Sequence, residues 1–134
     1  MSAIMDFFKA AAGICQTPLL SSEQWSLDRG KLTLNPDEIP ELGKSGGAVH
    51  MKGGGLNESV LVVRGQDDRF YAFSNRCTHM GRRLDPAPGE QKLRCCSVNH
   101  ATYSFDGAKL SGPAKGPVKV YPVEQRDGTL IVSL

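Results

Sequence analysis

The segments CTHMGRRL at residues 77–84 and CCSVNHATYSF at residues 95–105 decide how this chain of 134 residues is interpreted. The first holds a cysteine and a histidine separated by one residue, and the second holds such a pair separated by three residues. Two thiolates on one iron and two imidazoles on a second iron, bridged by two sulfides, make a two-iron centre. We therefore predict a [2Fe-2S] cluster held between the two segments. The four candidate ligands are Cys77, His79, Cys96 and His100.

The charge of such a ligand set eases reduction. Two ferric ions, two sulfides and two thiolates sum to zero, whereas replacing both imidazoles by thiolates would make the total minus two. An added electron therefore meets less repulsion, and the reduction potentials of the class lie at roughly −150 to +300 mV. The second ring nitrogen of each histidine faces outwards and can lose a proton in the oxidised state, so proton affinity and electron affinity are expected to be linked.

Two alternatives for these residues stay open. Structural zinc is one, because two cysteines and two histidines are a normal zinc ligand set and the total span suits it. Unrelated core cysteines and hydrogen-bonded histidines are the other. The glycine and proline residues beside both pairs, and the hairpin tips predicted there, favour a metal centre over core positions.

The remaining cysteines and the third histidine receive other roles. Cys95 adjoins Cys96, and neighbouring residues of a strand point in opposite directions, so Cys95 is predicted to face the core. Cys15 lies in an apolar segment and is predicted to be a small buried hydrophobe. His50 lies far upstream in a predicted strand and is interpreted as a surface or packing residue.

The pattern of the chain predicts an all-β protein. Short runs rich in β-branched and aromatic residues alternate with turn signals, which is typical of an antiparallel sandwich or barrel. Both ligand segments lie at the tips of predicted hairpins, and residues 85–90 are predicted to be a loop. The predicted strands are residues 31–34, 46–52, 59–64, 70–74, 92–95, 103–105, 118–124 and 129–132.

Composition argues against two classes of partner. The hydrophobic fraction of 40% and the charged fraction of 22% are ordinary for a globular protein. A net charge of +2 gives no case for nucleic-acid binding, and no apolar run approaches the roughly 18 residues of a membrane span.

The four cysteines are not spaced as a disulfide framework. Metal binding by reduced thiols fits them better, and reduced thiols favour a cytoplasmic protein.

The chain is expected to form one domain at residues 30–134, preceded by an extension at residues 1–29. An amphipathic helix is predicted at about residues 2–14 of the extension, because its apolar side chains recur at helical spacing. A secretory signal is a second interpretation of this apolar start, although a basic beginning is missing.

CTHMGRRL is very similar to the first ligand box of the Rieske family, Cys–x–His–x–Gly–x–x–Leu. The stretches FDG at residues 105–107 and SGPA at residues 111–114 also resemble the family, as do IPELG and VLVVRGQDDRFYAFSN upstream. The resemblance covers about residues 30–134. It implies a Rieske-type antiparallel β-sandwich or barrel with a small cluster-binding subdomain of two hairpin loops. In that arrangement the two cysteines bind the buried iron, and the two histidines bind the outer iron near solvent.

The second ligand box departs from the family. Its usual form is Cys–x–x–His, commonly with a proline after the cysteine, whereas here three residues separate Cys96 from His100 and none is proline. The second loop is therefore expected to bulge. The alternative places Asn99 where the histidine usually stands, but a neutral amide is a poor iron donor beside imidazole.

The resemblance implies a soluble one-electron carrier of the Rieske ferredoxin type rather than an enzyme. Rieske proteins of the respiratory bc complexes carry an extra cysteine in each loop, and Arg82 stands at the matching position here. The expected partners are a reductase and a terminal oxidoreductase such as an oxygenase. Alternatives are a small electron-transfer subunit of a larger oxidoreductase, or a module like the small subunit of nitrite reductase.

Side chains around the ligand segments are expected to tune electron transfer. Positive charge near the cluster favours its reduced state and steers an acidic partner towards it. Thr102 and Tyr103 are candidate hydrogen-bond donors to the cluster sulfurs, which would raise the potential. The arginines that flank the two loops are Arg76, Arg82, Arg83 and Arg94.

Overall fold

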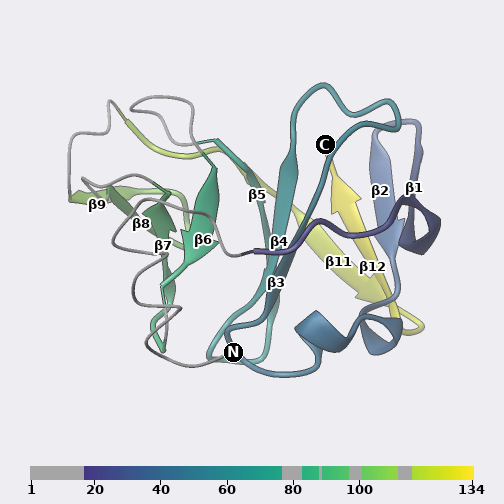
Figure 1. Ribbon diagram of the computed structural model, residues 1–134, viewed down its shortest axis with the longest axis horizontal. Helices are drawn as coiled ribbons and strands as arrows, with labels where there is room; N and C mark the ends of the chain where they lie inside the picture. The colour runs from purple at the N-terminus through teal and green to yellow at the C-terminus, as the bar shows by residue number, and fades with distance from the viewer. Residues whose placement is uncertain (1–16, 77–82, 88, 97–100, 112–115) are drawn as a thin grey trace.

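In the residues that it describes, the computed structural model consists mainly of short β-strands in three antiparallel sheets, each with four strands (Figure 1). It describes residues 17–76, 83–87, 89–96, 101–111 and 116–134. No helix within these ranges is long and apolar enough to cross a bilayer. The described helices are three short 3-10 turns, η1 (Ser22–Gln24), η2 (Pro36–Glu38) and η3 (Pro40–Leu42).

The three sheets lie in layers, which we call the outer, middle and loop sheets (right, centre and left in Figure 1). The outer sheet has the order β1 (Trp25–Asp28), β2 (Lys31–Leu34), β12 (Thr129–Ser133), β11 (Val123–Arg126). The middle sheet has the order β10 (Val120–Tyr121), β5 (Phe70–Ser74), β4 (Val60–Arg64), β3 (Ala48–Met51). The loop sheet has the order β6 (Leu84–Pro86), β7 (Lys92–Cys95), β8 (Thr102–Ser104), β9 (Lys109–Ser111).

The middle sheet is buried on both faces, and β4 shows why. Successive side chains of a strand point to opposite faces. Val60 and Val62 belong to the apolar core shared with the outer sheet, whereas Leu61 and Val63 belong to the core shared with the loop sheet. A strand that is buried on both sides needs a continuous apolar run rather than an alternating one, and VLVV at residues 60–63 supplies it.

The structure confirms the strands predicted at residues 31–34, 70–74 and 92–95. The segment predicted as one strand over residues 118–124 is two strands, because Pro122 ends β10 in the middle sheet and β11 begins in the outer sheet. A proline cannot donate to a ladder, so it suits the point where the chain changes sheets.

Three strands were not expected from the sequence: β1, β6 and β9. The predicted loop at residues 85–90 in fact begins within β6. All three are edge strands of their sheets. An edge strand needs only one neighbour and tolerates exposed polar side chains or a proline, so it lacks the apolar pattern on which strand prediction depends.

The segment that precedes β1 in the sequence is hydrogen-bonded to the middle sheet. Residues 17–20, which we call the strap, run beside β3 and form a parallel bridge in which Leu19 faces His50. The N–H of His50 donates to the carbonyl of Pro18 at 3.0 Å, and the N–H of Leu20 donates to the carbonyl of His50 at 2.8 Å. The predicted helix at residues 2–14 and Cys15 lie outside the described residues.

Candidate metal centre

Both candidate ligand loops leave from one end of the loop sheet. The first loop runs between the end of β5 and the start of β6, and the second runs between the end of β7 and the start of β8. Leu84 of β6 is paired with Cys95 of β7, and the N–H of Cys95 donates to the carbonyl of Ala101 at 2.8 Å. The described ends of both loops therefore lie side by side, as a ligand set drawn from two loops requires.

Cys96 is the candidate ligand that the structure describes. It directly follows β7, its side chain is buried, and its N–H donates to the carbonyl of Arg83 at 2.9 Å. This bond ties the first residue of the second loop to the last part of the first loop. Cys77, His79 and His100 lie outside the described residues.

Cys95 faces the core, as its position beside Cys96 predicted. Its side chain is 1% exposed and belongs to the apolar cluster between the middle and loop sheets. Leu84, Ala101 and Tyr103, which are fully buried, belong to the same cluster. This packed layer lies under the loop ends, so it gives them a rigid base.

Asn75 closes the first loop, a role that no motif in the sequence predicted. Its side chain is buried, and its Oδ1 accepts the N–H of Leu84 at 2.8 Å. Its Nδ2 donates to the hydroxyl of Ser59 at 3.1 Å. One amide therefore joins the residue before the loop to the residue after it. A polar residue at the end of the apolar strand FYAFS, two positions before Cys77, was the available signal.

His50 is a packing residue, the second of the two roles expected for it. Its side chain is only 3% exposed. Its Nδ1 lies 3.1 Å from the carbonyl oxygen of Thr17, and its Nε2 lies 3.3 Å from a guanidinium nitrogen of Arg83. Burial, followed by the charge of Arg83, lowers the pKa of His50 below 6.5. The imidazole is therefore neutral near pH 7.

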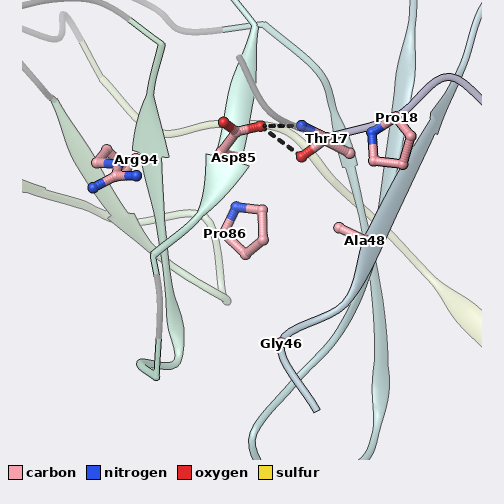
Figure 2. A pocket seen from close by; sticks show the side chains of 7 residues that line it. All are labelled: Thr17, Pro18, Gly46, Ala48, Asp85, Pro86 and Arg94. Carbon is pink, nitrogen blue, oxygen red and sulfur yellow. Dashed lines mark hydrogen bonds between the residues drawn. The ribbon is translucent and has the colours of Figure 1, made fainter. Parts of the chain in front are cut away.

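A second contact joins the strap to the loop sheet. The carboxylate of Asp85 on β6 accepts hydrogen bonds from the N–H of Thr17 at 3.1 Å and from its hydroxyl at 2.5 Å (Figure 2). Asp85 is buried, and the contact closes one side of a cavity of about 200 Å³. The cavity is lined by Thr17, Pro18, Gly46, Ala48, Asp85, Pro86 and Arg94.

The flanking arginines are not equivalent. Arg76 is exposed, whereas Arg83 contacts His50 and Arg94 lines the cavity. Arg82 lies outside the described residues.

The two candidate hydrogen-bond donors to the cluster sulfurs also differ. Tyr103 is fully buried in the core, whereas the hydroxyl of Thr102 lies 2.6 Å from that of Ser111. Their contacts with a cluster stay a prediction.

The described residues fit a two-iron cluster at the loop ends. A buried cysteine immediately after a central strand suits the inner iron, and its backbone is joined to the neighbouring loop. The donor set predicted from the sequence, two cysteines and two histidines, matches that of a Rieske centre, in which imidazoles replace two thiolates.

The comparisons with known proteins agree with this geometry. The model of the Rieske [2Fe-2S] domain matches residues 35–122. The cytochrome b6-f complex iron-sulfur subunit of Chlorobaculum tepidum is 31% identical over 79 residues, which are 59% of this chain and 43% of that subunit. The chain therefore aligns with less than half of that relative.

Two solved structures show the same architecture. The ferredoxin of carbazole 1,9a-dioxygenase from Nocardioides aromaticivorans IC177 aligns with a TM-score of 0.57 and 26% identity, over 67% of this chain and 86% of the ferredoxin. A quaternary ammonium Rieske monooxygenase aligns with a TM-score of 0.54 and 20% identity, over 69% of this chain and 28% of the monooxygenase. The second likeness is one of fold alone.

Proposed function

Because the chain belongs to the Rieske [2Fe-2S] domain family, we propose that it is a one-electron carrier between a reductase and a terminal oxidoreductase such as an oxygenase. The cofactor is a Rieske-type [2Fe-2S] cluster. When bound, this cluster accepts and returns one electron at a time. The protein holds the cluster, sets its potential and presents it to partner proteins.

The proposed ligands are divided between the two loops. Cys77 and Cys96 hold the inner iron, and His79 and His100 hold the outer iron. The buried position of Cys96 supports the assignment of the cysteines to the inner iron, because a thiolate beneath the surface keeps its iron away from water. The link between the N–H of Cys96 and the carbonyl of Arg83 supports a fixed distance between the loops.

One observation supports a carrier. The chain aligns with 86% of the ferredoxin of a dioxygenase at 26% identity. The aligned part therefore corresponds to nearly all of a separate electron carrier.

The second candidate function is that of an electron-transfer subunit. The relative from Chlorobaculum tepidum is a subunit of a cytochrome complex and is 31% identical over the aligned residues. A carrier exchanges partners, whereas a subunit stays with one complex. Size-exclusion chromatography of the natively expressed protein separates the two, because a carrier elutes at its own mass and a subunit elutes with its complex.

The cluster assignment is tested on anaerobically purified full-length protein. We expect two irons and two acid-labile sulfides per chain, and an electron paramagnetic resonance signal after reduction with dithionite. Structural zinc would instead give a colourless protein without such a signal. A separate oxygenase that oxidises the reduced protein in a stopped-flow experiment would support the carrier, whereas failure with every reductase and oxygenase tested would count against it.

The ligand assignment is tested with single variants. Cys77→Ser, Cys96→Ser, His79→Ala and His100→Ala are expected to lose the visible chromophore, because each removes one iron ligand. Cys95→Ala is the matched control, since its thiol lies next to Cys96 but faces the core. Asn99→Ala is expected to keep the chromophore. Loss of the chromophore in Asn99→Ala together with its retention in His100→Ala would show that the second box has been assigned incorrectly.

A further inference from the structure

We propose that His50 is a positioning residue for the cluster, acting through Arg83 on the backbone of Cys96, the residue that directly follows β7. The inference rests on the proposed function, because it takes Cys96 as an iron ligand. His50 lies on β3 of the middle sheet, 46 positions before Cys96 in the sequence. It therefore connects a sheet that carries no candidate ligand to the site.

The imidazole of His50 is held in one orientation. A carbonyl oxygen can only accept, so Nδ1 carries the proton that is donated to Thr17. A guanidinium can only donate, so Nε2 is the acceptor for Arg83. The backbone of His50 is bonded to the strap on both sides, through Pro18 and Leu20. These four contacts leave the buried ring little freedom.

Arg83 connects His50 to the backbone of Cys96. Its guanidinium donates to His50, while its carbonyl accepts the N–H of Cys96 at 2.9 Å. The next residue, Leu84, is held by the side chain of Asn75, which directly follows β5 of the middle sheet. One side chain on the middle sheet and one directly after it thus hold two consecutive residues at the end of the first loop. These residues lie beside the first residue of the second loop.

The bond between His50 and Arg83 also fixes a positive charge near the site. Arg83 is exposed apart from this contact, so without an acceptor its guanidinium would move in solvent. Positive charge stabilises the reduced cluster, which carries one more negative charge than the oxidised one. Loss of the acceptor is therefore expected to lower the midpoint potential and to broaden the distribution of cluster geometries.

Two amide variants test the hydrogen bonds of the two ring nitrogens of His50 one at a time. The side-chain oxygen of His50→Gln reaches the place of Nε2 and can accept from Arg83. The side-chain nitrogen of His50→Asn reaches the place of Nδ1 and can donate only to Thr17. Both are neutral amides, so they differ mainly in which bond is kept. We compare iron and labile sulfide content, midpoint potential and the width of the paramagnetic resonance lines.

We expect His50→Gln to keep the wild-type potential and line width, and His50→Asn to show a lower potential and broader lines at unchanged iron content. In an Arg83→Ala background, His50→Asn is expected to cause no further shift, because the bond is already absent. Equal shifts in both amide variants, no shift in His50→Asn, or a full shift in the Arg83→Ala background would overturn the proposal.

The wild-type protein distinguishes this inference from the proposed function. If it contains no iron and labile sulfide, the proposed function fails and the inference fails with it. If it contains the cluster but the two amide variants behave alike, only the role of His50 fails.

Discussion

At Asn75 and His50, single polar side chains link the candidate metal centre to the middle sheet. Asn75 joins both ends of the first loop through Leu84, and His50 holds Arg83. Buried polar groups are expensive unless they are hydrogen-bonded, so both residues are useful only with their partners in place. These residues specify where the loop ends lie, whereas the apolar cluster beneath them specifies only that they are buried.

The lowered pKa of His50 predicts a dependence of stability on pH. The unfolded chain binds a proton at His50 near pH 6.5, whereas the folded protein binds it only at lower pH. The unfolded state therefore binds more protons in this interval, and the free energy of unfolding falls as the pH drops below about 6.5. Urea unfolding at several pH values measures this fall.

His50→Gln is the comparison for this prediction. It removes the titrating group, so the fall in unfolding free energy between about pH 6.5 and 5 is expected to be smaller than in the wild type. His79 and His100 are present in both proteins and cancel in the comparison. The same pH dependence in both proteins would contradict a lowered pKa at His50.

The turn between β8 and β9 shows how an element depends on one glycine. Gly107 has a φ of 91°, and its carbonyl accepts the N–H of Val118 at 2.8 Å. A Cβ at Gly107 would collide with the backbone oxygen of Val118. The turn thus packs against the segment that leads to β10, and only a residue without a side chain permits this approach.

Gly107→Ala is therefore predicted to destabilise the protein more than Gly128→Ala. Gly128 has a φ of 80° in the turn between β11 and β12, but nothing lies within 4 Å of its added Cβ. Both variants have the cost of a left-handed alanine, about 1–2 kcal/mol, and Gly107→Ala has the collision in addition. The midpoint of thermal unfolding measures the difference, and equal losses would argue against the packing described for Gly107.

Across the whole molecule, the middle sheet supports two separate cores. One lies against the outer sheet and the other against the loop sheet. Tyr71 and Phe73 of β5 contact the ring of Phe105 with centroid distances of 4.8 and 5.6 Å, which joins the middle sheet to the loop sheet. The candidate metal centre therefore depends directly on one of the two cores.

Neighbouring residues of β4 test this division. Leu61 faces the loop sheet and Val62 faces the outer sheet, and both are fully buried. Replacing either by alanine removes buried methyl groups, which for leucine costs about 2–5 kcal/mol. The two variants are compared at urea concentrations that give them the same free energy of unfolding. Under these conditions we expect the visible chromophore to be lost faster from Leu61→Ala than from Val62→Ala. Equal rates of loss would show that the two cores act on the site as one.

The amino-acid sequence by itself determined the local features of this protein. The spacing of Cys77 and His79 predicts a ligand box, and the apolar runs predict central strands, because both depend on residues close in the chain. Only the tertiary structure decided that Thr17 bonds Asp85, 68 positions away, and that His50 bonds Arg83, 33 positions away. Such partners, like the neighbours of the edge strands, are brought together by the packing of sheets, and no spacing within a segment encodes them.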